Sequence, residues 1–297
     1  MTDSIRLVEV GPRDGLQNEA RPLSVEQRLE LIQKLADSGL TEIEAGSFVS
    51  PKWVPQMADT DQVLAGLNLK GPNHYPVLVP NQKGLDAAIQ AGAKDIAVFG
   101  AASESFSQKN INCSIEESLN RFRPVAAQAQ EAGIRVRGYV SCLVACPYEG
   151  PIKPAQVVPV VRALFDMGCY EVSLGDTIGK GTPRSIKAVL DALLTEFPAN
   201  RLALHCHDTY GMALANIMAG LERGIRVFDS SLGGAGGCPY APGASGNVAT
   251  EDVVYLLEQE GFNTGVNLAT LVDTGRWLFH LLDKVPASRV NLAYSAG

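Results

Sequence analysis

The chain has 297 residues, 46% of them hydrophobic and 19% charged, which is typical of a protein with a large buried core. Its 25 basic and 32 acidic side chains give a net charge of -7, and no long basic cluster occurs, which argues against nucleic-acid or membrane-surface binding. No secretory signal is visible, and no apolar stretch approaches the ~20 residues that span a bilayer. We therefore expect a cytoplasmic protein whose six scattered cysteines are reduced.

Short apolar or β-branched runs alternate with longer segments of helical periodicity along the chain. Several helical segments stop at a glycine, Ser114 is a candidate N-cap, and a long polar loop is expected between residues 99 and 115. The predicted strands are 5–10, 41–45, 75–79, 95–99, 134–139, 170–174, 202–204 and 227–229, and the predicted helices are 25–38, 57–66, 83–91, 115–132, 154–167, 183–197, 212–223 and 248–260.

Eight such strand–helix units predict a TIM barrel, the (β/α)8 fold in which helices surround eight parallel strands. Their regularity favours this α/β fold over an open, doubly wound sheet. An additional C-terminal helix is expected over 268–283, and no composition break divides residues 1–297, so we predict one catalytic domain. The apolar residues Trp277, Leu278 and Phe279 of the last helix could pack on the barrel or on a second subunit, and a homodimer is the commoner assembly.

Unusual polar residues follow the predicted strands, at the carboxyl ends where barrel enzymes carry their sites. Taken singly, Asp176 and Asn247 have an ordinary explanation as helix caps. Glu44 and Arg137 are harder to explain, because each interrupts an apolar strand and an unpaired buried charge is costly. Together these residues indicate a polar site at one end of the barrel.

His205 and His207 stand at the end of the seventh predicted strand, where side chains at i and i+2 point the same way. Alone, the pair fits two hydrogen-bonded histidines as well as a metal site. With Asp14 and the amide oxygen of Asn247 it forms a nitrogen–oxygen ligand set that suits Mg²⁺ or Mn²⁺. A structural zinc site is disfavoured, since it would need more closely spaced cysteines than the sequence offers.

Arg13, next to Asp14, cannot readily lose its proton and is suited to stabilising negative charge that develops on an oxygen. Cys238 lies in a glycine-rich segment, 233–247, whose glycines would permit a mobile lid, and its thiol is a candidate for proton transfer. Neither a phosphate-binding P-loop nor a dinucleotide fingerprint is present. The leading class is therefore metal-assisted cleavage or formation of a carbon–carbon bond.

Five segments resemble the 3-hydroxy-3-methylglutaryl-CoA lyase family, and the resemblance covers about residues 5–270. The family implies a TIM barrel that cleaves 3-hydroxy-3-methylglutaryl-CoA to acetyl-CoA and acetoacetate during leucine degradation, with an acyl-CoA as its partner. The matching segments are 8–19, 47–57, 173–179, 205–210 and 236–241.

The resemblance also implies roles for individual residues. Arg13 resembles the residue that stabilises the enolate of the departing thioester, and Cys238 resembles the lid cysteine that takes part in proton transfer. Glu44 and Asp176 resemble supporting acidic residues. The residues that resemble ligands of a divalent cation, Mg²⁺ or Mn²⁺, are Asp14, His205, His207 and Asn247.

Two other functions stay open. One is a related lyase for a bulkier thioester, such as 3-hydroxy-3-isohexenylglutaryl-CoA. The other is a protein that binds metal and CoA without catalysis, which would need neither Arg13 nor Cys238. A condensing synthase is disfavoured, because those enzymes usually carry a further C-terminal domain.

Overall fold

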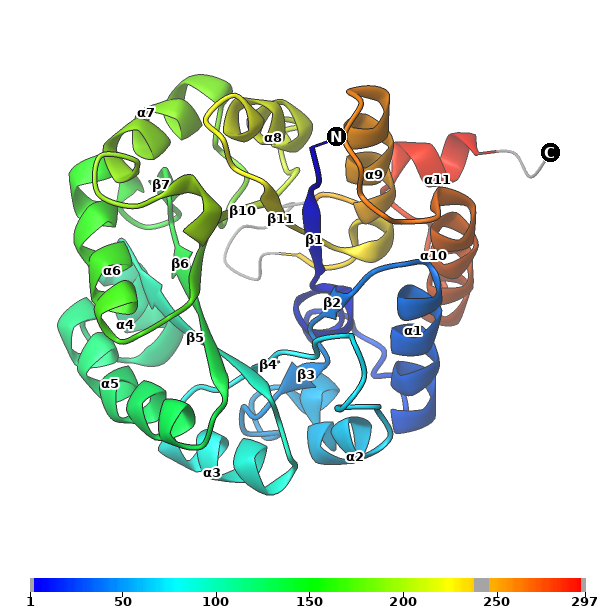
Figure 1. The fold of residues 1–297 in the computed structure, drawn as a ribbon, viewed down its shortest axis with the longest axis horizontal. Coiled ribbons are helices and arrows are strands. Elements are labelled where there is room, and N and C mark those ends of the chain that lie inside the picture. The colour runs from blue at the N-terminus through cyan, green and yellow to red at the C-terminus, as the bar shows by residue number, and fades with distance from the viewer. Residues whose placement is uncertain (1–2, 238–245, 295–297) are drawn as a thin grey trace.

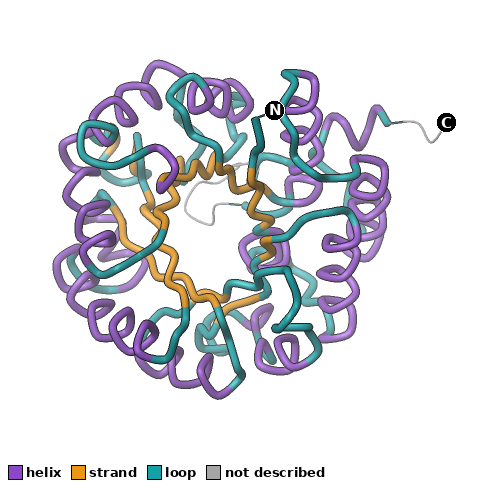
Figure 2. The backbone as a smooth tube through the Cα atoms, in the orientation of Figure 1, coloured by secondary structure: helices purple, strands orange, loops and turns teal. Residues whose placement is uncertain are grey.

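Parallel strands form a closed ring with helices outside it in the computed structural model, which describes residues 3–237 and 246–294 (Figure 1). Figure 2 shows the ring of strands at the centre and the helices as an outer layer. The order of the sheet is β2-β1-β11-β10-β9-β6-β5-β4-β3. The predicted TIM barrel is confirmed.

The second barrel strand is divided into two short strands, β2 (Glu42–Ile43) and β3 (Gly46–Ser47). The first half pairs with β1 and the second with β4, so this segment closes the ring. Between the halves, the amide of Glu44 donates to the carbonyl of Glu9 at 2.9 Å. The nine strands of the sheet therefore form the eight strands of a barrel. The other seven are β1 (Arg6–Glu9), β4 (Val77–Leu78), β5 (Asp95–Ala101), β6 (Arg135–Ser141), β9 (Glu171–Asp176), β10 (Leu202–Cys206) and β11 (Val227–Ser230).

The predicted helices are present, with boundaries that differ by a few residues. Capping boxes at Ser24 and Ser114 start two of them by satisfying free backbone amides. A small hairpin, β7 (Ala145–Cys146) and β8 (Gly150–Pro151), follows β6. The helices around the barrel are α1 (Val25–Asp37), α2 (Thr60–Ala65), α3 (Gln82–Gln90), α5 (Ile115–Glu131), α6 (Pro154–Asp166), α7 (Pro183–Leu193), α8 (Ala213–Leu221) and α9 (Thr250–Gln259).

The prediction of a long polar loop between residues 99 and 115 is wrong, because most of that segment is a helix, α4 (Glu104–Ile111). Ser103 caps it, with its hydroxyl accepting the amide hydrogen of Phe106 at 3.1 Å. Only Phe106 and Ser107 of this helix are buried. The helix therefore has too few apolar residues to show helical periodicity in the sequence. The capping residue is the feature that indicates where it begins.

The last predicted helix is α10 (Leu268–Leu282), which lies beside α1 (Figure 1) and is followed by a short helix, α11 (Arg289–Ala293). Leu278 and Phe279 are buried within the chain. The Phe279 ring takes the space beside Gly233, where a Cβ would come within 2.2 Å of it. These apolar residues therefore pack on the barrel.

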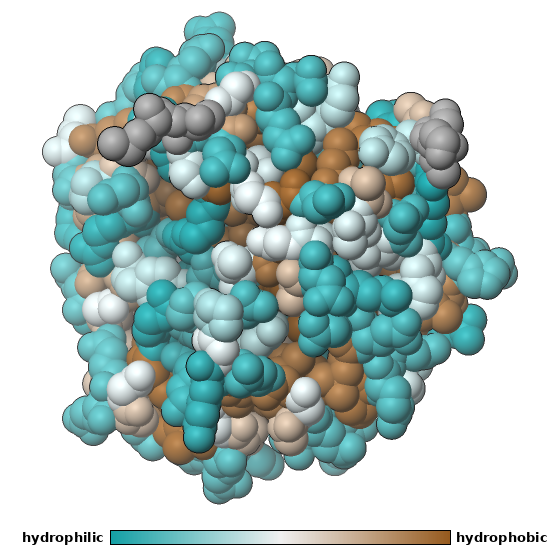
Figure 3. Space-filling view, turned by 45° about the vertical axis from the view of Figure 1, so that its right-hand side comes forward, coloured by the Kyte–Doolittle hydropathy of each residue, from teal (hydrophilic) through white to brown (hydrophobic). Residues whose placement is uncertain are grey.

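Hydrophilic side chains cover most of the face shown in Figure 3, and hydrophobic ones appear between them in patches. Of the helices in the described part of the chain, none combines the length and the apolar character needed to cross a membrane.

Candidate active site

Asp14, His205 and His207 meet at the carboxyl end of the barrel. Asp14 lies in the π-helical turn Gly11–Gly15 that follows β1, and His205 lies on β10 with His207 just beyond it. One potential ligand atom from each side chain lies within 4.8 Å of the others. Asn247 joins them, donating its side-chain N–H to Asp14 Oδ2 at 2.9 Å. The structure thus brings together the four residues predicted as metal ligands, whose role as ligands stays a prediction.

Two atoms of this cluster are buried without a hydrogen-bond partner among the described residues: Asn247 Oδ1 and His207 Nδ1. Burial and the neighbouring His205 lower the pKa of His207 to about 4, so its imidazole is neutral and keeps a lone pair. Buried polar atoms without a partner are costly, and a cation bound by the cluster would supply a partner for an unpaired oxygen or nitrogen. The cluster therefore fits a divalent metal bound by imidazole nitrogen and by carboxylate and amide oxygen.

Asp229 of β11 orients His205. Its Oδ2 lies 3.2 Å from His205 Nδ1, whereas His205 Nε2 faces Asp14 Oδ2 at 4.0 Å. Burial alone would lower the pKa of His205, but the hydrogen bond and charge of Asp229 and the charge of Asp14 raise it. A carboxylate on one imidazole nitrogen fixes the ring and leaves the other nitrogen for a metal.

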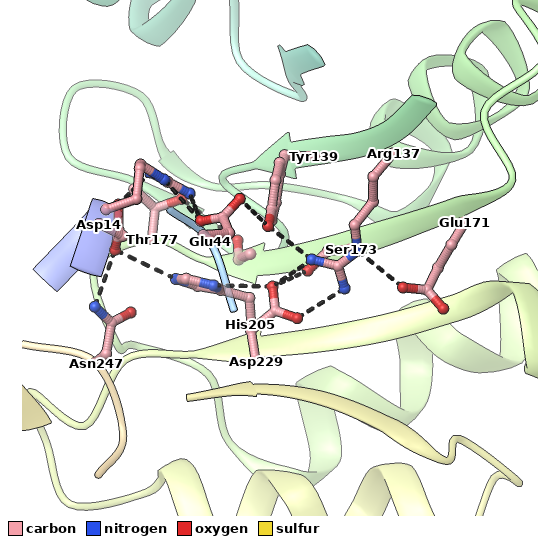
Figure 4. Close-up of polar contacts among 12 residues, drawn as sticks. Asp14, Glu44, Arg137, Tyr139, Glu171, Ser173, Thr177, His205, Asp229 and Asn247 are labelled. Carbon is pink, nitrogen blue, oxygen red and sulfur yellow. Dashed lines mark hydrogen bonds and ion pairs between the residues drawn. The ribbon is translucent and has the colours of Figure 1, made fainter. Parts of the chain in front are cut away.

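Arg137 of β6 holds Asp229 from inside the barrel. Its Nη2 donates to Asp229 Oδ1 at 2.7 Å, and its Nε donates to Glu171 Oε1 at 2.8 Å. The Ser173 hydroxyl also holds Asp229, by donating a hydrogen bond to its Oδ2 at 2.7 Å. Burial alone would raise the pKa of Asp229, but the Arg137 charge and His205 hold it well below its usual value. Figure 4 shows the resulting row of polar contacts, which runs from Asn247 to Glu171.

Arg13 and Glu44 form a second buried ion pair beside the cluster. Arg13 Nε and Nη2 both lie 2.7 Å from Glu44 Oε2, and Arg13 Nη1 donates to Asp14 Oδ1 at 2.7 Å. The Tyr139 hydroxyl donates to Glu44 Oε1 and accepts from Arg137 Nη1, each at 2.7 Å. Burial raises the pKa of Glu44 in spite of the neighbouring Arg13. Tyr139 thus links Arg137, which donates to its hydroxyl, to Glu44 and through Glu44 to Arg13.

Asp176 ends β9 and is paired in register with Cys206 of β10, next to the histidines. It is buried, and its Oδ2 accepts the Gly181 amide hydrogen at 2.7 Å, whereas its Oδ1 has no partner among the described residues. Burial raises the pKa of Asp176 to about 6. No guanidinium neutralises this carboxyl group within the described structure, which distinguishes it from Asp229 and Glu44.

Cys238 lies outside the described residues, as does most of the predicted lid segment 233–247. The described residue next to it, Gly237, accepts a hydrogen bond from Asn18 Nδ2 at 2.9 Å through its carbonyl oxygen. The proposed role of the cysteine therefore stays a prediction.

Two further residues of the network were not singled out by sequence: Asp229 and Glu171. The signal for Asp229 was present, because it is a carboxylate inside a short buried strand, as Glu44 is. Its partner could not be read from the sequence, since Arg137 is 92 residues away.

The comparisons with known proteins agree with this geometry. A family model described as HMGL-like matches residues 4–278. The mitochondrial hydroxymethylglutaryl-CoA lyase of Pongo abelii is 56% identical over 286 residues, which are 96% of this chain and 88% of that protein. The crystal structure of the hydroxymethylglutaryl-CoA lyase of Pseudomonas aeruginosa is 55% identical, with a TM-score of 0.96, and the match covers 99% of this chain and 98% of that one.

A more distant structure carries ligands. It is an HMG-CoA lyase from Acinetobacter baumannii in complex with coenzyme A and 3-methylmalate. It is 35% identical to this chain and has a TM-score of 0.94, with 99% of this chain and 96% of that chain covered.

Replacing Asp229 with Asn should weaken divalent-metal binding. The amide keeps the shape but loses the charge that holds His205, and loss of such a partner typically costs about 10–100-fold in metal affinity. The measurement is a Mn²⁺ titration of the folded variant. Ser173→Ala, which removes only one donor to the same carboxylate, is the matched control and should have a smaller effect. Wild-type affinity in Asp229→Asn would refute the orienting role.

Replacing Asp176 with Asn should stabilise the metal-free protein at neutral pH. The folded pKa of about 6 lies above the ordinary value of 3.8, so the folded state binds the proton more tightly and wild-type stability falls as pH rises between these values. The variant avoids this loss, and we expect a gain of about 1–3 kcal/mol in the free energy of unfolding at pH 7.5. Urea unfolding at pH 7.5 and at pH 3 tests it, and the gain should vanish at pH 3, which lies below both pKa values. A less stable variant at pH 7.5 would contradict the assignment.

Proposed function

The chain belongs to the HMGL-like family, and we propose that it cleaves 3-hydroxy-3-methylglutaryl-CoA to acetyl-CoA and acetoacetate as a metal-dependent carbon–carbon lyase. The observation that carries this proposal is the cluster of Asp14, His205 and His207, with Arg13 held directly beside it. Relatives that match nearly the whole chain bear the name of this lyase, which supports the methylglutaryl substrate over a bulkier one and over a non-catalytic binding role.

The proposed cofactor is Mg²⁺ or Mn²⁺. The donor set of two imidazoles, a carboxylate and an amide oxygen contains no thiolate, which favours these ions over zinc in a structural site. When bound, the cation would orient the substrate's carboxylate and hydroxyl groups and make the hydroxyl more acidic. The protein's part is to hold Asp14, His205, His207 and Asn247 around one point.

Cleavage begins when the 3-hydroxyl loses its proton and the electron pair of that O–H bond forms the ketone of acetoacetate. The bond between C2 and C3 breaks, and its electrons pass to the thioester as an enolate. Arg13 keeps its positive charge, since its neighbours Glu44 and Asp14 raise its pKa despite burial. A fixed cation is suited to stabilising the enolate oxygen. Protonation of the enolate carbon then gives acetyl-CoA.

Proton transfer needs a group that exchanges a proton close to neutral pH. Asp176, with its pKa raised to about 6 by burial, has a value in that range. We assign Cys238 the transfer to the product enolate. Tyr139 stays protonated, because burial raises its pKa well above the ordinary value, and it serves as a hydrogen-bond donor to Glu44.

The binding partner, the pathway, the location and the oligomeric state of the protein belong to the same proposal. An acyl-CoA partner is supported by the relative whose structure holds coenzyme A. Leucine degradation as the pathway, which the resemblance implies, and a cytoplasmic location are part of the proposal. A homodimer rests on the general frequency of such assemblies.

The purified protein should release acetoacetate from 3-hydroxy-3-methylglutaryl-CoA, and a chelator should abolish the release until Mg²⁺ or Mn²⁺ is restored. A coupled assay of acetoacetate measures this. The 3-hydroxy-3-isohexenylglutaryl thioester, assayed in parallel, should be cleaved more slowly. Absence of cleavage with every 3-hydroxyglutaryl thioester would overturn the lyase assignment.

Replacing Arg13 with Met should lower turnover by about 10²–10³-fold, the usual cost of losing one group that stabilises a developing oxyanion. Mn²⁺ binding should remain close to wild type, because Asp14 keeps its carboxylate. Arg13→Lys retains the charge and is the control for folding, since the methionine variant leaves Glu44 buried without its partner. Unchanged turnover in Arg13→Met would end the assigned role.

A further inference from the structure

Glu9, the last residue of β1, carries a buried carboxylate that the chemistry above does not use. Its Oε1 accepts hydrogen bonds from two backbone amides, those of Gly11 at 2.8 Å and Leu232 at 2.9 Å. Its Oε2 accepts a third from the Thr250 hydroxyl at 2.6 Å. No cation pairs with it in the part of the chain that the structure describes. Backbone and hydroxyl donors alone therefore hold this carboxylate.

Two of the three donors, Gly11 and Thr250, lie close in sequence to members of the metal cluster, whereas the segment of Leu232 carries none of them. Gly11 begins the turn that carries Asp14, and Leu232 follows β11. Thr250 begins α9, three residues after Asn247. Because Asn247 also donates to Asp14 at 2.9 Å, the contacts form a closed loop. In it, Glu9 holds the backbone amide of Gly11, ahead of Asp14, and the hydroxyl of Thr250, which follows Asn247.

Gly11 is adapted to this contact. A Cβ at that position would lie 2.5 Å from Glu9 Oε1, too close for any side chain unless the carboxylate moved. Burial raises the pKa of Glu9 to about 7 although all three hydrogen bonds lower it, so the carboxylate is costly to keep in the fold. Stability alone does not explain such a group, since apolar packing would serve the barrel better.

We propose that Glu9 is a positioning residue for the metal site, which sets the separation of Asp14 and Asn247 by anchoring the Gly11 backbone ahead of Asp14 and the Thr250 side chain after Asn247. It acts through Gly11 and Thr250 and touches neither metal ligand. The inference rests on the proposed function, because it presumes that these residues bind a divalent cation.

Mn²⁺ titrations of the purified full-length protein test the proposal. Glu9→Ala removes all three hydrogen bonds, and we expect its Mn²⁺ affinity to fall by about tenfold or more, as for other residues that orient metal ligands. Glu9→Gln keeps an oxygen for the two amides and should lie closer to wild type. Equal losses in the two variants would refute the hydrogen-bond account.

Glu42→Ala is the matched control for a structural role. Glu42 is also a buried carboxylate, but it bonds Arg6 and Tyr170 at the amino end of the barrel. Loss of the Glu42 carboxylate should lower the melting temperature of the protein and leave its Mn²⁺ affinity unchanged. If Glu9→Ala behaves in the same way, the positioning role is wrong.

Two further measurements allow the proposal and the metal site to be tested separately. Thr250→Val removes one hydroxyl with little change of volume, so it tests the link to α9 even if Glu9→Ala does not fold. We expect its Mn²⁺ affinity to fall several-fold, and wild-type binding would count against the proposal. Wild-type protein that binds Mn²⁺ no better than Asp14→Ala would instead refute the metal site itself, and with it the proposed function.

Discussion

The ion pair between Arg137 and Asp229 inside the barrel is the contact on which the geometry of the site depends. Both side chains are fully excluded from solvent, and Nη2 and Oδ1 lie 2.7 Å apart. Neither charge has water as an alternative partner, so Asp229 cannot turn away from Arg137 without a large cost. Since Asp229 also contacts His205, the orientation of this imidazole follows from the packing of β6, β10 and β11.

This arrangement is not explained by stability. The interior of a TIM barrel is usually filled by branched apolar side chains. Here Arg137, Glu171, Asp229, Glu44 and Arg13 occupy part of it, all buried. Buried ion pairs contribute little net stability, and apolar replacements of similar volume are often neutral or stabilising. What the charges provide is a fixed direction for the hydrogen bonds that Arg137 donates to Asp229 and Glu171 and that Arg13 donates to Glu44.

The sequence was sufficient where the signal is local. Alternation of apolar runs and helical periodicity predicts the eight barrel strands, and the spacing of His205 and His207 predicts that they share a face. It was insufficient for α4, whose polar sequence hides a capped helix, and for Asp229, whose role depends on Arg137 far away in the chain. Glu9 shows the same limit, since its three donors come from residues 11, 232 and 250. These hydrogen-bond partners are far apart in the sequence and come together only in the folded barrel.

Asp229 and Asp176, two buried carboxylates of the site, differ in whether the barrel places a guanidinium beside them. Asp229 has Arg137, which keeps its pKa well below the usual range and makes it a permanent anion that can orient an imidazole. Asp176 is buried without such a partner among the described residues, and its pKa rises to about 6. A carboxyl group of that kind can change its protonation state near neutral pH, which Asp229 cannot. Of these two buried carboxyl groups only Asp229 has a guanidinium beside it, so the place of Arg137 on β6 accounts for much of the difference between their pKa values.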